Sequence, residues 1–295
     1  MKDRIKFSEH LIEALPYIRH FYGKSVVIKY GGAAMSNDTL KKEFCRDIVL
    51  LAYVGMRPVV VHGGGPQVTE LMKRLGKDTK FIDGLRVTDK ETIDIAEMVL
   101  TGHVGKEIIA LMNQEGGNAV CLSGKDANLI RARKIVHRRV SDPSVEIDIG
   151  FVGEVDSINP QIIRSLEDGG FIPVISPVGI GEDGHAYNIN ADTIAGEIAA
   201  ALNAERLILL SDIPGVLKDV DDADSLITSL PASKTMKLIE SGAAAGGMIP
   251  KLKACLRGLE GGVKKTHIID GRMPHSVLLE LFTDTGIGTQ IYPDV

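Results

Sequence analysis

The chain has 295 residues, of which 44% are hydrophobic and 25% charged, so it can bury a sizeable core in one large domain or two lobes. A formal net charge of −5 and an aromatic content of 4% argue against a nucleic-acid-binding surface, which needs basic patches and stacking side chains. The 3 cysteines are widely spaced and contain no Cys-x-x-Cys pair, which predicts buried thiols in a reducing compartment and no zinc site.

Neither the apolar stretches nor the N-terminal sequence indicates a membrane protein. No apolar stretch reaches the roughly 18 residues of a membrane-spanning helix. The N-terminus, Met1-Lys2-Asp3-Arg4, is followed by mixed charge and not by the apolar region of a signal peptide. We therefore expect a cytoplasmic protein that makes no membrane contact.

The first predicted element in chain order is an amphipathic helix. Four apolar residues recur on one of its faces: Leu11, Leu15, Ile18 and Tyr22. Ser8 is expected to be its N-cap, and Pro16 is expected to kink the helix or end it early. A helix in this position can pack on its own domain or contact another subunit, and the pattern leaves both open.

Six short apolar runs are predicted to be strands: Ser25–Lys29, Pro58–Val61, Ala119–Leu122, Ile172–Ser176, Leu207–Leu210 and Lys265–Ile269. Helix-length segments separate them, which indicates an α/β fold with a parallel sheet covered on both faces. One helix is expected to run from Ile93 to Leu111 behind a capping box at Thr88-x-x-Glu91, and another after Asn190. The charged, alternating segment 133–155 predicts an antiparallel hairpin that leaves the main sheet.

Two strand ends carry glycines. Lys29 closes the first strand and is followed by Gly31-Gly32, which places an ammonium group and bare amides where α/β sheets bind ligands. The next strand leads through His62 into Gly63-Gly64-Gly65 and Pro66, a turn whose amides and helix N-terminus favour an anion. Far along the chain, Gly246-Gly247 precedes Lys251. Together these segments predict phosphoryl transfer.

Other polar residues fit this prediction less specifically. Arg86 lies just ahead of a helix and suits bidentate capture of a carboxylate. Asn188 and Asn190 alternate to one side, and Asn190 also suits a helix cap. Asp192 falls in the first helical turn, where it either serves the positive end of the helix or pairs with both lysines.

Two nucleotide-binding motifs are excluded. Segment 179–184 matches Gly-x-Gly-x-x-Gly, but Glu182 and Asp183 place carboxylates where a pyrophosphate would bind, and no helix is expected before Ala191. A dinucleotide-dependent dehydrogenase is therefore rejected. The segment around Lys125 lacks the earlier glycine and the hydroxyl residue of a P-loop, so the predicted kinase is not a P-loop enzyme.

Six segments in order resemble the amino acid kinase family, and within it the members that phosphorylate N-acetyl-L-glutamate. They are Val26–Gly32, Val59–Gly65, Gly84–Thr88, Asn188–Asp192, Leu209–Leu217 and Gly246–Lys251. The resemblance runs from about Ser25 to Ile291. It implies transfer of the ATP γ-phosphoryl group to the side-chain carboxylate, giving N-acetyl-L-glutamyl 5-phosphate in the second step of arginine biosynthesis.

The resemblance also implies an architecture, an open three-layer αβα sandwich with a mainly parallel sheet. Residues 1–23 would form an oligomerisation helix, residues 24–200 an N-terminal lobe that holds the acceptor, and residues 201–295 a C-terminal lobe that holds ATP. Mg²⁺ would arrive with ATP and be held mainly by the nucleotide, with no metal ligands assigned to the protein.

Roles carry over residue by residue. Lys29 and Lys251 would stabilise the transition state, and Asp192 would organise them. The acceptor-binding residues would be Gly64, Gly65, Arg86, Asn188 and Asn190. The nucleotide-binding residues would be Gly31, Gly32, Ser211, Asp212, Lys218 and Met248.

Arginine-inhibited members of the family resemble this chain in having an N-terminal helix like Phe7–Tyr22. In them these helices interlace dimers into a homohexamer, a trimer of dimers. We therefore expect an arginine site bordered by Tyr17, His267, Glu280 and Gly286, with a nitrogen-signalling protein as a further candidate partner. Two alternatives stay open: a same-fold kinase for carbamate, aspartate, glutamate or a nucleoside monophosphate, and a catalytically silent arginine sensor.

Overall fold

The computed structural model describes residues 2–35, 37–139, 142–219, 221–244 and 246–294. Within them, eight strands form one sheet in the order β14-β16-β15-β13-β1-β2-β10-β5. The strands are β1 (Ser25–Tyr30), β2 (Arg57–His62), β5 (Ala119–Leu122), β10 (Ile172–Ile175), β13 (Arg206–Ser211), β14 (Ser229–Pro231), β15 (Lys265–Asp270) and β16 (Thr289–Tyr292). Every neighbouring pair is parallel except β15 with β16. The six predicted strands and their mainly parallel arrangement are confirmed.

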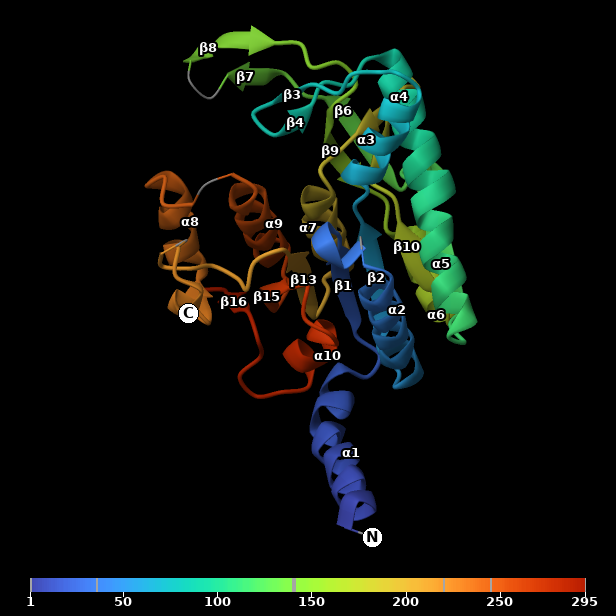
Figure 1. Cartoon of the computed structure of the whole chain (residues 1–295), viewed down its shortest axis with the longest axis vertical. Coiled ribbons are helices and arrows are strands. Elements are labelled where there is room, and N and C mark those ends of the chain that lie inside the picture. Colours follow the sequence, from blue (N-terminus) through green and yellow to red (C-terminus); the bar gives the residue numbers. More distant parts are fainter. Residues whose placement is uncertain (1, 36, 140–141, 220, 245, 295) are drawn as a thin grey trace.

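Helices cover both faces of this sheet, because alternate strand residues point to opposite sides. Val26 and Ile28 belong to a core with α2 (Asp38–Tyr53), α3 (Gly65–Arg74), α5 (Gly105–Gln114) and α10 (Ser276–Leu281). Val27 belongs to the other core, with α6 (Gln161–Asp168), α7 (Ala191–Leu202), α8 (Ala232–Glu240) and α9 (Met248–Glu260). The three-layer prediction is therefore confirmed (Figure 1).

Smaller elements gather beyond the carboxyl ends of the strands. A second sheet has the order β12-β11-β6-β9, built from β6 (Ile130–Lys134), β9 (Gly153–Ile158), β11 (Val178–Gly181) and β12 (Ala186–Asn188). Two ribbons lie near it in Figure 1, β3 (Phe81–Ile82) with β4 (Leu85–Arg86) and β7 (His137–Arg139) with β8 (Asp142–Ile147). Both β6–β9 and β7–β8 are antiparallel, which confirms the predicted excursion, of which residues 140–141 lie outside the described part.

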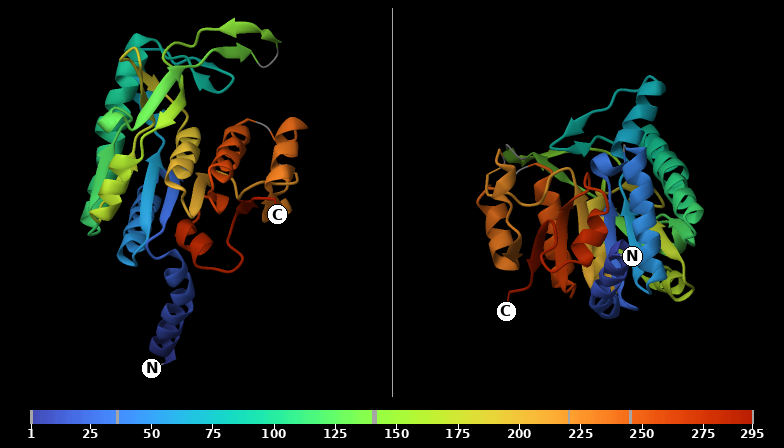
Figure 2. Two further views of the ribbon diagram at one scale, coloured as in Figure 1. Left: turned by 180° about the vertical axis from the view of Figure 1, so that it is seen from behind. Right: turned by 60° about the horizontal axis from the view of Figure 1, so that its bottom comes forward.

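The N-terminal helix α1 (Lys2–Phe21) projects away from the body at the end opposite β7 and β8, as Figures 1 and 2 show from two sides. The expectation that Ser8 is its N-cap was wrong, because Ser8 lies inside the helix. The helix continues past Pro16, so the early end expected there was also wrong, and the alternative, a kink at Pro16, stays a prediction. Much of the helix is exposed, with Leu11, Ile12 and Leu15 at 59%, 68% and 49%.

The helix predicted after Thr88 begins with a different cap. The Asp89 carboxylate accepts from the Thr92 N–H and starts α4 (Lys90–Glu97), whereas Thr88 is buried and donates its hydroxyl to the Arg86 carbonyl. The predicted capping box was therefore wrong, because backbone bonds to Ile149 and Phe151 hold Thr88 in extended structure. Between α4 and α5 the chain forms a π-helical segment, η2 (Met98–Val104).

Three short 3₁₀ turns complete the described elements: η1 (Gly32–Met35), η3 (Asp126–Asn128) and η4 (Ala223–Ser225). In the part of the chain that the structure describes, no helix combines the length and apolar character needed to cross a membrane. The division into two lobes at residue 200 stays a prediction. Strands from before and after residue 200 belong to one continuous sheet, so the sheet itself marks no boundary there.

Close approach of α7 and α9 is a feature on which the site depends. A Cβ at Gly196 would lie 2.7 Å from the Ala254 carbonyl oxygen, so a side chain there would force the two helices apart. Asp192 lies one turn earlier on α7, and Lys251 lies on the facing part of α9. The helix spacing thus sets the distance between these two side chains.

We expect Gly196→Val to lower the free energy of unfolding by about 2 kcal/mol or more, through overpacking against α9. Gly102→Val is the matched control, because a Cβ at Gly102 meets no atom within 4 Å. Urea unfolding of both variants measures the difference. Equal stability of the two would contradict the packing argument.

Candidate active site

Neighbouring strands of the main sheet end level with one another and bring both glycine turns together. Tyr30 at the end of β1 pairs with His62 at the end of β2. A Cβ at Gly63 would lie 3.8 Å from the Gly31 Cα, so the turns are in contact. Parallel strands that end at one edge make the crevice where open α/β sheets bind ligands.

Strand alternation explains where the first lysine points. Lys29 shares its side of β1 with Val27, which faces the α7 and α9 layer. Its Nζ lies 3.2 Å from Oδ1 of Asp192 on α7. Lys251 on α9 places its Nζ 2.9 Å from Oδ2 of the same carboxylate. The structure therefore brings all three predicted catalytic residues into one cluster.

This cluster is buried, and burial governs its electrostatics. The exposed fractions of the Lys29, Lys251 and Asp192 side chains are 11%, 13% and 8%. Burial lowers the pKa of Lys29, the Asp192 carboxylate opposes that shift, and the Lys251 ammonium adds to it. Burial acts to raise the pKa of Asp192, but the two ammonium groups outweigh it and the pKa is lowered. Two cations thus share one anion, which leaves positive charge for a ligand.

A cavity of about 710 Å³ lies beside the lysines. The predicted nucleotide-binding residues that line it, together with Lys29 and Lys251, are Gly32, Ser211, Asp212, Lys218 and Met248. Gly31 is not part of this lining and lies instead against the Lys29 ammonium. Gly32 adopts φ +68°, and a Cβ there would lie 2.2 Å from Oδ1 of Asp212. Only glycine fits this approach of the first turn to β13.

A second cavity, of about 220 Å³, is bordered by the predicted acceptor-binding residues: Gly64, Gly65, Arg86, Asn188 and Asn190. The buried Arg86 guanidinium donates to the Gly65 carbonyl and to the Thr69 hydroxyl at 2.9 and 2.8 Å. Burial lowers its pKa, although arginine stays charged at neutral pH. Asn190 also caps α7, as one sequence interpretation expected, because its side chain accepts from the Asp192 and Thr193 N–H groups.

The Asp192 cluster connects the two cavities. Asn190 and Ala191 line the smaller one, and the next residue, Asp192, holds the lysines that line the larger one. The rejected dinucleotide motif does not contribute, because β11 and β12 pair antiparallel across segment 179–184 and no helix starts there. Among the described residues, no group of three or more His, Cys, Asp or Glu side chains is placed to hold a metal ion.

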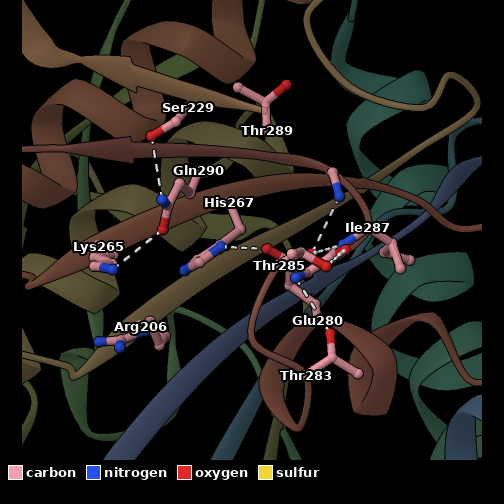
Figure 3. Close-up of polar contacts among 12 residues, drawn as sticks. Arg206, Ser229, Lys265, His267, Glu280, Thr283, Thr285, Ile287, Thr289 and Gln290 are labelled. Carbon is pink, nitrogen blue, oxygen red and sulfur yellow. Dashed lines mark hydrogen bonds and ion pairs between the residues drawn. The ribbon is translucent and has the colours of Figure 1, made fainter. Parts of the chain in front are cut away.

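A third cavity, of about 290 Å³, lies where α1 meets the body of the molecule. All four residues predicted for an arginine site line it: Tyr17, His267, Glu280 and Gly286. Figure 3 shows His267 directed at Glu280, with Nδ1 2.6 Å from Oε1, and Glu280 also accepts the Ile287 N–H at 2.7 Å. Burial acts to raise the pKa of Glu280, but its hydrogen bonds hold that pKa below the usual value.

Residues 24–270 match the amino acid kinase family. A relative from Moorella thermoacetica, an acetylglutamate kinase, is 57% identical over 284 residues, which are 96% of each chain. Another acetylglutamate kinase, from Pelotomaculum thermopropionicum, is 56% identical over 95% of this chain and 96% of its own. The chain belongs to the acetylglutamate kinases of the amino acid kinase family.

Solved structures extend the likeness to the fold. An N-acetylglutamate synthase from Neisseria gonorrhoeae, complexed with coenzyme A and N-acetyl-glutamate, matches with a TM-score of 0.83 and 29% identity. The match covers 98% of this chain but only 64% of the synthase, which is less than two thirds of its length. Carbamate kinase from Giardia lamblia bound to AMP-PNP matches with a TM-score of 0.65 at 18% identity, which shows the shared fold alone.

Sequence reasoning assigned no role to several residues that border these cavities. Phe81 and Leu100 line the smaller cavity, and Arg206 and Lys265 line the cavity beside α1. Phe81 and Leu100 resemble core residues in the sequence, and the two basic residues stand at strand starts. Strand starts lie at the edge of the sheet opposite the glycine turns, and no local signal marks them.

We expect Lys29→Met to raise the melting temperature while it removes turnover. Because the Lys29 pKa is lowered in the folded state, its charge costs stability throughout the pH range below its unfolded pKa of about 10.4. Replacing it leaves Asp192 paired with Lys251, and a gain on the order of 1 kcal/mol corresponds to about 2 °C. Lys24→Met is the control that should change little, because the Lys24 side chain, paired with Glu205, is 39% exposed whereas that of Lys29 is 11% exposed. A lower melting temperature for Lys29→Met would contradict the argument.

Proposed function

We propose that this chain transfers the γ-phosphoryl group of ATP to the side-chain carboxylate of N-acetyl-L-glutamate. The product is N-acetyl-L-glutamyl 5-phosphate, and the reaction is the second step of arginine biosynthesis. The observation that carries the proposal is the meeting of Lys29 and Lys251 on Asp192 between two cavities. Membership of the acetylglutamate kinases supports the choice of acceptor.

The acceptor determines what the site has to supply. A carboxylate with a pKa near 4.3 is ionised at neutral pH, so no general base is required. The barrier lies in bringing two anions together and in the charge that spreads over the transferred phosphoryl oxygens. Lys29 and Lys251 would offset that charge from the two sides, with Asp192 holding both ammonium groups in position. Preorganised donors of this type are each worth about 3–4 kcal/mol.

The larger cavity suits the nucleotide. Its wall combines apolar side chains such as Val216 and Ile227 with Lys218 and the Ser211 hydroxyl. The lining also includes the Asp212 carboxylate, an oxygen ligand of the kind that Mg²⁺ prefers. The residues therefore fit a Mg²⁺ ion that arrives with ATP and is held mainly by phosphate oxygens and water. The ion would supply further positive charge to the phosphates.

The smaller cavity suits the acceptor. Arg86 would pair with a carboxylate of N-acetyl-L-glutamate, and the Asn188 and Asn190 amides would bind polar groups of the substrate. Gly64 and Gly65 begin α3, so their N–H groups precede the first intrahelical hydrogen bond and are free to face an anion. Apolar neighbours such as Leu100 and Val152 would contact the acetyl methyl group.

Turnover of Lys251→Ala is expected to fall at least 100-fold, as for loss of a preorganised donor. Lys253→Ala is the matched control, because Lys253 lies on the same helix but is exposed. ATP-dependent acyl phosphate formation, trapped as the hydroxamate, measures both. Wild-type protein tested with carbamate, aspartate and glutamate separates the alternative acceptors, and absence of any turnover would favour the silent sensor. Activity of Lys251→Ala within tenfold of wild type would remove Lys251 from the mechanism.

We also propose that arginine binds in the cavity beside α1 and inhibits the enzyme. Glu280 and Asp284 supply carboxylates there, and the Tyr17 hydroxyl donates to Asp284. The exposed apolar residues of α1 support a homohexamer in which these helices interlace. A cytoplasmic location and a nitrogen-signalling partner remain predictions.

Removing residues 1–22 is expected to reduce the oligomer size in sedimentation and to abolish arginine inhibition. Glu280→Gln in the full chain is the companion variant, expected to weaken inhibition while the oligomer persists. Unchanged sedimentation and an unchanged arginine response in the truncated chain would rule out both roles of the helix.

A further inference from the structure

One buried histidine has no role in the reaction as described above. His62 is the last residue of β2 and is completely buried. It shares its side of the strand with Val60, and so faces η2 and α5, away from the lysine cluster. The turn that directly follows His62, however, contains Gly63, Gly64 and Gly65, of which Gly64 and Gly65 are proposed to bind the acceptor.

Both ring nitrogens of His62 have partners. Nδ1 lies 2.6 Å from the Gly63 carbonyl oxygen, and Nε2 lies 3.0 Å from the Ser176 hydroxyl. Burial lowers the pKa of His62 to about 4, although the bond to Gly63 acts in the opposite direction. The neutral ring has one N–H, and a carbonyl oxygen can only accept, so the proton resides on Nδ1. Nε2 then accepts from Ser176.

The surrounding groups agree with this tautomer. The Ser176 hydroxyl has a second acceptor within reach, the Leu100 carbonyl, but that contact is 3.3 Å and the contact to Nε2 is 3.0 Å. The shorter contact favours donation to His62, and the Cys121 thiol, 3.7 Å from the same hydroxyl oxygen, can donate to Ser176 in turn. A Cβ at Gly105 would lie 2.3 Å from Cys121 Sγ and 3.4 Å from Nε2, so glycine at this position lets the start of α5 pack against Cys121 beside the ring.

The bond to the Gly63 carbonyl has a consequence for the next amide. In a planar trans peptide the C=O and the following N–H point in opposite directions. A fixed Gly63 carbonyl therefore fixes the direction of the Gly64 N–H. Glycine on both sides would otherwise let this peptide rotate at low cost. The Gly63 N–H is fixed as well, by the Tyr30 carbonyl at 2.7 Å.

We propose that His62 is a positioning residue for phosphoryl transfer, whose Nδ1–H holds the Gly63 carbonyl and so directs the Gly64 N–H at the transferred group. The inference rests on the proposed function, because it needs Gly64 to act on the acceptor or on the phosphoryl oxygens. His62 itself touches no substrate. Its contribution is to keep a flexible glycine turn in one arrangement before the ligands arrive.

Three substitutions separate this role from simple packing. His62→Asn can place an amide N–H near the Nδ1 position, whereas His62→Gln places one near Nε2 and His62→Leu supplies neither. We expect His62→Gln and His62→Leu to lower kcat by about tenfold to 100-fold, the upper value being the loss of a whole donor. The KM for ATP should stay within about twofold, and His62→Asn should recover kcat to within about fivefold of wild type. Val60→Ala, in the same strand, controls for lost stability and should keep wild-type kcat.

The result that would overturn the proposal is His62→Leu with kcat within threefold of wild type, or His62→Asn as impaired as His62→Leu. NMR of wild-type protein labelled with ¹⁵N-histidine tests the same bond without turnover. We expect a neutral ring protonated at Nδ1 from pH 5.5 to 8, and protonation at Nε2 would refute the proposal. If wild-type protein fails to phosphorylate N-acetyl-L-glutamate, the proposed function fails, and the labelled spectrum still shows whether the His62 Nδ1–H is in place to hold the Gly63 carbonyl.

Discussion

Burial of two ammonium groups against one carboxylate is the interaction on which the rest of this structure depends. Lys29 comes from the first strand and Lys251 from a helix far along the chain, and Asp192 contacts both. A carboxylate cannot neutralise two cations, so the cluster favours a further anion. The large sheet and the close packing of α7 and α9 hold these charges in place although each would be better solvated in water.

The two cavities beside this cluster differ in size and lining, and each suits its proposed ligand. The larger one has an extended apolar wall, suited to a purine and ribose, with its charge gathered near the lysines. The smaller one is lined by glycine amides, asparagine side chains and a buried arginine, suited to a compact dicarboxylate. A net charge of −5 for the whole chain does not oppose binding of these anions, because the relevant positive charge is local and partly desolvated.

Much of the fold could be predicted from the sequence, because buried parallel strands leave continuous apolar runs and glycine turns mark their ends. Lys29 could be recognised for the same reason. Other features depend on contacts between distant segments and could not. The sequence from Thr88 to Glu91 matches a capping box. In the structure, however, Thr88 forms a β-bridge with Gly150, and Asp89 is the N-cap of the helix. Likewise, the sequence allows Asp192 either to serve the positive end of its helix or to pair with both lysines. Only the packing of α7 against α9 distinguishes these two interpretations.

The position of β1 within the main sheet has a consequence for biosynthesis. Val26 pairs on one side with Pro58, which follows it closely in the chain, and on the other with Arg206. During translation the chain up to Ile175 can assemble β1, β2, β5 and β10, but one edge of β1 stays open until β13 has left the ribosome. An unpaired apolar edge in a nascent chain is prone to wrong pairing. The strand that carries Lys29 therefore depends on timely completion of the chain.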